Sequence, residues 1–106
     1  MARRVVWTDH ALDELREIAE YVAQQDPQES SRIVTAALAQ ADERAEFPES
    51  GAVVPELDSH SVREIIIKRA FRLIYEVSRD QITVLAVVRA RKRLDRKSLR
   101  SRRPLE

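Results

Sequence analysis

The segment from Arg63 to Arg93 constrains the fold most, because it reads as consecutive β-strands that run into a dense block of arginine and lysine. From residue 62 onward, apolar and polar residues tend to alternate, which is the side-chain period of a strand with one buried face. We predict strands at Ile65–Ile67, Phe71–Val77 and Gln81–Val88. The short connections between these strands favour an antiparallel sheet.

A short strand and a first helix are predicted ahead of this sheet. The residues Arg3–Trp7 are mostly β-branched or aromatic apart from the arginines, as is common in strands. Thr8 or Asp9 can cap the helix that follows, in which apolar residues recur on one face as far as Val22. The acidic residues of this helix, Glu14 among them, are expected to face solvent.

A second helix is predicted from Pro27 to about Ala45. Asp26 can serve as its cap, and Pro27 suits the first helical position, where a backbone N–H is not needed. Several alanines on the buried side allow close approach of the two helices, so an antiparallel helical hairpin is expected. The complete order is β-α-α-β-β-β, an α+β fold with the hairpin packed on one face of a small antiparallel sheet.

Length and composition indicate a single domain in the cytoplasm. The 106 residues have the size of one domain; we assign residues 1–90 to it and residues 91–106 to a basic C-terminal segment of the same domain. The absence of cysteine excludes disulfides, thiolate zinc sites and thiol nucleophiles. No apolar run approaches the roughly 18 residues that cross a bilayer, and the N-terminus lacks the apolar core of a signal peptide. No membrane contact is therefore expected.

Charge is strongly segregated along the chain, although the net charge is only +1. Between Thr8 and His60, thirteen acidic residues stand against three basic ones; between Arg89 and Arg103, nine basic residues stand against one acid. Such separation produces a strong local field and favours a polyanion or an acidic protein segment as partner. The basic block is either a binding surface, which is the interpretation we favour, or a solvated tail.

The remaining residues with reactive side chains are given structural roles. His10 is expected at the surface of the first helix and His60 in an exposed loop, and neither has a partner at metal-ligand spacing, so we expect no metal and no cofactor. Tyr75 shares the buried face of its strand and is expected in the core. Glu76 shares the other face with Arg72, and an ion pair is its expected role.

The segments VVWTDHALDELREIAEYVA, FPESGAVVPEL, REIIIKRAFRLIYEV and ITVLAVVRARKR together cover nearly the whole chain. In this order and spacing they resemble the RelE/ParE superfamily of toxins from bacterial type II toxin–antitoxin systems. The resemblance is closest to the ParE branch, in the helical hairpin and in FPESGAVVPEL. It implies the same β-α-α-β-β-β fold. ParE-type toxins often carry an arginine directly after the glycine of this segment, where the chain has Ala52.

The resemblance implies one of two functions, and the fold alone does not distinguish them. RelE-type toxins cut messenger RNA on the ribosome, using basic residues on the sheet and usually a tyrosine or histidine near the C-terminus. Arg72, Lys68 and Arg91 match the basic part of such a site, but no tyrosine or histidine follows Lys92. ParE-type toxins inhibit DNA gyrase by binding. We therefore predict a gyrase inhibitor without catalytic residues, with the ribosome-dependent ribonuclease acting on messenger RNA as the alternative.

The resemblance also implies a cognate ParD-like antitoxin that joins the toxin in a hetero-oligomer through a segment that folds on contact. We expect an apolar groove between the helical hairpin and the sheet edge to receive this segment. The residues expected to bind the antitoxin are Leu12, Leu15, Ala19, Val22, Arg69, Arg72 and Arg89. Those expected to bind the target are Arg89, Arg91, Lys92, Arg93 and Arg96.

Overall fold

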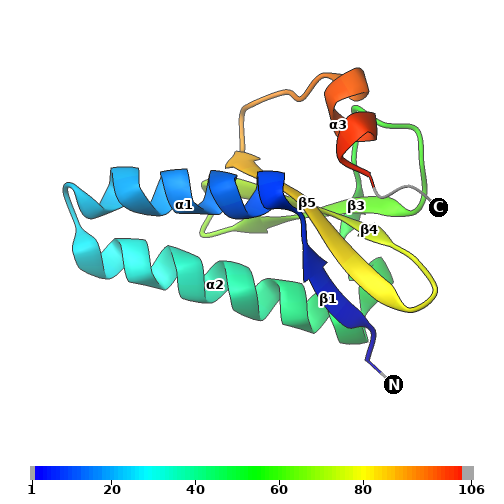
Figure 1. Ribbon diagram of the computed structural model, residues 1–106, viewed down its shortest axis with the longest axis horizontal. Coiled ribbons are helices and arrows are strands. Elements are labelled where there is room, and N and C mark those ends of the chain that lie inside the picture. The colour runs from blue at the N-terminus through cyan, green and yellow to red at the C-terminus, as the bar shows by residue number, and fades with distance from the viewer. Residues whose placement is uncertain (1, 104–106) are drawn as a thin grey trace.

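The computed structural model describes residues 2–103, which form one sheet with a helical hairpin on one face and a short helix on the other (Figure 1). In chain order the elements are β1 (Arg4–Trp7), α1 (Asp9–Ala23), α2 (Pro27–Glu46), the 3₁₀ helix η1 (Pro48–Ser50), β2 (Ala52–Val53), β3 (Val62–Ile67), β4 (Phe71–Val77), β5 (Gln81–Arg89) and α3 (Arg96–Arg102). The strands lie in the order β1-β5-β4-β3-β2. In the described part of the chain, every helix is too short or too polar to cross a bilayer.

The predicted α+β fold is confirmed, with two differences in the sheet. Four strands follow the helices where three were predicted, because the two-residue strand β2 pairs with β3. The pairs from β2 to β5 are antiparallel, but β1 pairs with β5 in parallel, with Val5 opposite Ile82 and Trp7 opposite Val84. The sheet is therefore mixed. An alternating pattern shows which face of a strand is buried but carries no information on the direction in which distant strands pair.

The helical hairpin forms where its caps predict. The Thr8 hydroxyl accepts a hydrogen bond from the Ala11 N–H at 3.1 Å, and the Asp26 carboxylate accepts one from the Glu29 N–H at 3.0 Å. The Ser30 hydroxyl donates to the Ala19 carbonyl at 2.6 Å and so joins the two helices. The two helices pack directly against each other, as the alanine-rich face predicts.

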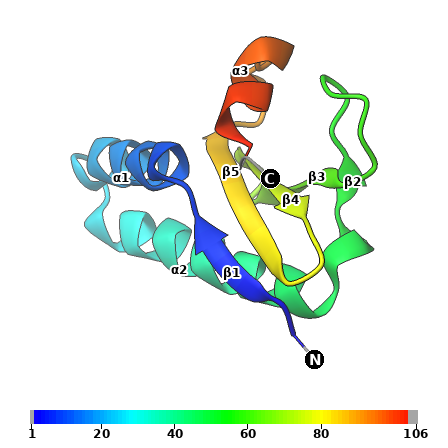
Figure 2. The same ribbon diagram turned by 45° about the vertical axis from the view of Figure 1, so that its right-hand side comes forward.

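The helical hairpin and α3 cover opposite faces of the sheet (Figure 2), and the buried apolar side chains form two separate clusters. Leu15 and Leu73 belong to the cluster beneath α1 and α2. On the opposite face, Leu57 of the loop after β2 packs with Leu94 and Leu99 of the C-terminal segment. Leu94 and Leu99 are the only leucines between Arg89 and Arg103, and both are buried. Their burial attaches the C-terminal segment to the sheet as far as Leu99.

Helix α3, like the short elements η1 and β2, is not predicted by the sequence. It begins after Asp95, whose carboxylate accepts the Lys97 N–H at 3.4 Å, and seven residues are too few to show a helical period. Arg103 follows the helix and donates to the Glu76 carboxylate at 3.0 Å, so Glu76 pairs with this arginine and not with Arg72 as predicted. The alternative of a solvated tail is therefore wrong for residues 94–103, while residues 104–106 of the predicted basic segment lie outside the described residues.

Side chains from α1 and α3 complete the edge of β5 beyond the end of β1. The pairing of β1 stops at Val84, and further along β5 the Val87 N–H donates to the Glu14 carboxylate at 3.1 Å. Arg102 donates to the same Glu14 oxygen at 2.8 Å. The prediction that Glu14 faces solvent is therefore wrong, because its carboxylate satisfies a backbone N–H that β1 does not reach.

Tyr75 is fully buried, which confirms its predicted place in the core, and its hydroxyl holds the segment around η1. The hydroxyl donates to the Pro48 carbonyl at 2.7 Å and accepts the Gly51 N–H at 3.0 Å. Gly51 has an ordinary φ of −82°, so backbone freedom is not the reason for glycine here. A Cβ at this position would lie 2.5 Å from the Tyr75 hydroxyl and 2.7 Å from the Glu64 carbonyl, and only glycine fits.

We therefore expect Gly51→Ala to lower the free energy of unfolding by about 1–3 kcal/mol, the usual cost of overpacking. Urea unfolding of the purified protein measures it. Ala52→Gly, one residue later at an exposed position, is the matched control, and we expect a change below about 1 kcal/mol because no close contact is made or lost there. Equal stability of Gly51→Ala and the parent protein would contradict the close packing.

Candidate functional site

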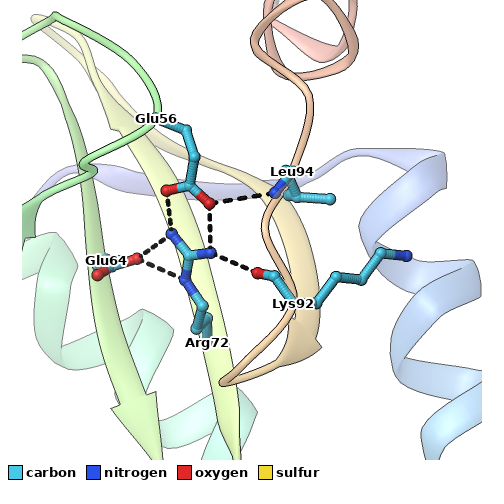
Figure 3. Close-up of polar contacts among 5 residues, drawn as sticks. All are labelled: Glu56, Glu64, Arg72, Lys92 and Leu94. Carbon is cyan, nitrogen blue, oxygen red and sulfur yellow. Dashed lines mark hydrogen bonds and ion pairs between the residues drawn. The ribbon is translucent and has the colours of Figure 1, made fainter.

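Arg72 of β4 is the centre of a buried ion-pair cluster, which we call the Arg72 hub (Figure 3). Its guanidinium donates to both oxygens of Glu56 at 2.7 and 2.8 Å, to Glu64 at 2.7 Å and to the Lys92 carbonyl at 2.8 Å. Its Nη2 also lies 2.6 Å from Glu64 Oε1. The five N–H groups of arginine are thus all used. The side chains of Arg72 and Glu56 are only 6% and 7% exposed.

The hub also holds the start of the C-terminal segment. The Glu56 carboxylate accepts the Leu94 N–H at 3.1 Å, and the Glu56 carbonyl accepts a bond from Arg96 at 3.2 Å. Hydrogen bonds from the Arg72 guanidinium hold the pKa of Glu56 down at about 2, from an ordinary value of 4.5. The carboxylates in turn raise the pKa of Arg72, so both partners are charged across the physiological range.

The hub leaves Arg72 with no free donor for the contacts that the sequence assigns to it. The sequence places Arg72 in an antitoxin-binding surface or, with Lys68 and Arg91, in a ribonuclease site. In the structure the Lys68 ammonium lies 3.5 Å from the Glu29 carboxylate of α2, whereas Arg91 is exposed and lines a shallow depression of about 240 Å³ above the hub. These three basic residues do not converge on one site.

A larger groove of about 810 Å³ lies between the second half of α1 and the adjacent ends of β4 and β5. It is lined by Glu17, Ile18, Tyr21, Val22, Arg69, Ala70, Phe71, Arg89, Ala90 and Arg91. Apolar side chains from α1 and β4 are combined with three arginines and a single acid. The Arg89 guanidinium carbon lies 5.5 Å from the centroid of the Tyr21 ring, a cation–π contact that holds both side chains beside the groove.

A strained turn places Arg69 beside this groove. Lys68 and Arg69 have positive φ values of 51° and 60°, and the Ala70 N–H donates to the Ile67 carbonyl at 3.0 Å. Two consecutive residues with positive φ are typical of the type I′ hairpin turn, where asparagine and glycine are preferred. Two long basic side chains at these positions cost on the order of 1–2 kcal/mol each in backbone energy, which is the kind of cost found at functional sites.

The structure brings together only part of the predicted antitoxin-binding set. Val22, Arg69 and Arg89 line the groove. Leu12 is 40% exposed on α1 but is not among the groove residues, and Ala19 is half-buried. Leu15 is only 6% exposed and belongs to the core beneath the helices, so its surface role is not supported.

Sequence reasoning missed several residues of the groove and the hub. Ile18, one turn before Val22, packs against the core cluster beneath the helices and also lines the groove, and its apolar position in the helix indicates only the first of these roles. Tyr21 is 59% exposed, and a large aromatic side chain that follows Glu17 and Glu20 on the same helix is the signal that could have marked it. Glu56 lies in an irregular loop, and no sequence pattern indicates its partner sixteen residues later in β4.

The residues predicted to contact the target are all exposed at the end of β5 and in the segment that follows. Beyond Arg89 the exposed cations form what we call the basic ridge, namely Arg91, Lys92, Arg93, Arg96, Lys97 and Arg100. Arg102 and Arg103 belong to the same basic block but point to carboxylates of the sheet and α1. The structure thus divides the block into a partly buried anchor, Arg102 and Arg103, and an exposed ridge.

Comparison with known proteins agrees with this architecture. Residues 5–94 match the family model described as the ParE toxin of type II toxin–antitoxin system, parDE. A solved structure, the chromosomal ParDE TA system from P. aeruginosa, has the same fold, with a TM-score of 0.68 and 21% identity over 83% of this chain and 96% of that one. No match is found among curated proteins. With a family match over most of its length, the chain belongs to the ParE toxin family of type II toxin–antitoxin systems.

Proposed function

We propose that this toxin acts in the cytoplasm by binding DNA gyrase and cuts no RNA itself. The burial of Arg72 is the observation that carries this proposal. The residue that would stabilise a phosphorane in a RelE-like site has every donor committed to Glu56, Glu64 and the Lys92 carbonyl. Lys68 is paired with Glu29, away from the depression that Arg72 and Arg91 share. A binding function does not require any of these groups to contact a substrate.

Two parallel assays on the purified toxin, refolded free of antitoxin, test this function. One measures the supercoiling of relaxed plasmid by gyrase, and the other maps breaks in messenger RNA in a translating extract. We expect loss of supercoiling with intact messenger RNA. Codon-positioned breaks with normal supercoiling would establish the ribonuclease alternative and overturn the proposal.

The groove between α1 and the strand ends is the proposed site for the antitoxin. Antitoxin arms that fold on contact present an apolar face with flanking acids, and the groove offers the complementary surface. Ile18, Val22 and Phe71 supply apolar area, while Arg69 and Arg89 supply positive charge beside it. The Tyr21–Arg89 contact keeps an aromatic ring and a guanidinium in place before the partner arrives, and this preorganisation lowers the entropic cost of binding.

Arg89→Glu should weaken binding of the antitoxin encoded beside the toxin gene by about 10–100-fold, equivalent to roughly 1.5–3 kcal/mol for a hydrogen bond to a charged group. Isothermal titration calorimetry measures the affinity. Arg79→Glu, an exposed arginine in the turn between β4 and β5, makes the same change of charge at the far end of β5. An equal loss of affinity in both variants would mean that net charge causes the effect and that Arg89 does not contact the antitoxin.

A further inference from the structure

We propose that the basic ridge binds the phosphate backbone of duplex DNA directly. The ridge adjoins the groove proposed for the antitoxin and shares Arg91 with it. The choice of DNA rests on the proposed function, because the enzyme proposed as target acts on duplex DNA. The ridge consists of the six exposed cations Arg91, Lys92, Arg93, Arg96, Lys97 and Arg100. Binding to phosphates does not require base contacts, so we expect no sequence preference.

The ridge carries charge that the protein itself does not neutralise. Within residues 2–103, none of the six side chains takes part in an ion pair. The one acid within the same stretch is Asp95, whose carboxylate caps α3 by accepting the Lys97 N–H. The ion pairs of the basic block are made by Arg102 and Arg103, which anchor it to Glu14 and Glu76.

The backbone of the ridge is held in place from beneath, so the positions from which its cations project are fixed by the fold. The Arg72 hub bonds the Lys92 carbonyl and the Leu94 N–H, and Leu99 of α3 is fully buried in the sheet cluster. On α3, Arg96 and Arg100 are one turn apart, a rise of roughly 6 Å along the helix. Duplex DNA carries a charge about every 1.7 Å of its axis, so neighbouring cations can contact neighbouring phosphates.

Because its charges are segregated, the molecule should approach a polyanion with one particular face. Thirteen of its acids lie between Thr8 and His60, a range that contains the helical hairpin, and the hairpin and α3 lie on opposite faces of the sheet (Figures 1 and 2). A negatively charged rod therefore attracts the face with α3 and repels the face with the hairpin. This attraction and repulsion act over about one Debye length, roughly 8–10 Å near physiological salt.

An acidic protein surface is the other candidate, and the ridge fits it less well. Protein interfaces depend on buried aromatic or aliphatic anchors. The leucines of this segment, Leu94 and Leu99, are buried, and the one large exposed apolar side chain beside it in the described chain is Ile66. The groove, by contrast, combines Tyr21 and Phe71 with its arginines. The two surfaces thus differ in chemistry, although they meet at Arg91.

Fluorescence anisotropy with a labelled 20-base-pair duplex of arbitrary sequence tests the proposal. We expect binding at 50 mM salt, with a slope of about −4 for log K against log salt, since each neutralised phosphate contributes about −0.9. The combined substitution Arg93→Gln, Lys97→Gln and Arg100→Gln should weaken binding by at least tenfold and reduce the slope by about 2–3. The control combination Arg16→Gln, Arg32→Gln and Arg79→Gln removes three exposed cations elsewhere and should change affinity by less than about threefold.

Three results would overturn the proposal: no binding of the parent protein at 50 mM salt, equal weakening by the two combinations, or a ridge variant that retains DNA affinity but loses affinity for DNA-free gyrase. The last would assign the ridge to an acidic protein surface. DNA binding through the ridge with normal supercoiling would instead reject the proposed function alone. Inhibition of gyrase by a toxin that does not bind DNA would reject only the role of the ridge.

Discussion

Replacing Arg72 with methionine should lower the free energy of unfolding by about 3–5 kcal/mol, the usual cost of removing one partner from a buried ion pair. The loss arises because Glu56 and Glu64 remain in place, 7% and 16% exposed, without the cation that compensates them. The Lys92 carbonyl also loses its hydrogen bond from Arg72, and the Glu56 carboxylate that accepts the Leu94 N–H loses its positively charged neighbour. Urea unfolding followed by circular dichroism measures the change.

A combined variant separates the uncompensated charge from the loss of packing. Arg72→Met with Glu56→Gln and Glu64→Gln removes all three charges, and we expect it to recover about half of the lost stability, since neutral groups are less costly to bury than unpaired carboxylates. The exposed Arg79→Met serves as the surface control and should change stability by less than about 0.5 kcal/mol. A loss below about 1 kcal/mol for Arg72→Met would mean that the hub is not buried in solution.

Acid should remove about 3 kcal/mol of stability through Glu56 alone. Its pKa is lowered from 4.5 to about 2 in the folded protein, and each unit of difference corresponds to about 1.4 kcal/mol. Because the folded pKa lies below the unfolded one, this contribution is complete above about pH 5 and decreases as the pH falls toward 2. Unfolding free energies measured at several pH values between 2 and 6 give the profile.

Glu56→Gln identifies the group responsible for this dependence. The variant cannot titrate at residue 56, so we expect it to be less stable than the parent at pH 6 and to lose about 3 kcal/mol less between pH 6 and 2. Glu49→Gln changes an exposed carboxylate two residues before Gly51 and should retain the parent profile. If the Glu56 variant lost as much stability as the parent over this range, the low pKa of Glu56 would be disproved.

Much of the architecture is predictable from local patterns. The caps Thr8 and Asp26 act within three residues of their partners, and period-2 alternation marks β3 to β5, so each signal lies within a few neighbouring residues. The parallel pairing of β1 with β5 is different, because it joins residues more than seventy positions apart. Helix α3 was missed because its docking depends on one buried leucine and not on a repeated pattern.

The sequence predicts the type of site, an apolar groove with basic residues, but not the full set of residues that line it. The count of charges predicts that the basic block is a binding surface. The resemblance to the toxin family predicts a groove between the helical hairpin and the sheet edge. Arg69 and Arg89 were found in this way. Arg72, which is equally basic in the sequence, is buried against two carboxylates, one of them in an irregular loop. Composition cannot distinguish an arginine that is exposed to solvent from one that forms a buried ion pair with a carboxylate from a distant loop.

The sequence by itself determined the helical hairpin, the strands β1, β3, β4 and β5 and the segregation of charge, because periodicity, capping and composition are properties of neighbouring residues. Only the tertiary structure decided which cations are free. It buries Arg72 with Glu56 and Glu64, directs Arg102 and Arg103 to Glu14 and Glu76, and leaves the basic ridge exposed. The physical reason is that an ion pair depends on distance in space. These partners come together only when the loop after β2 folds onto the sheet and the C-terminal segment reaches the loop, β4 and α1.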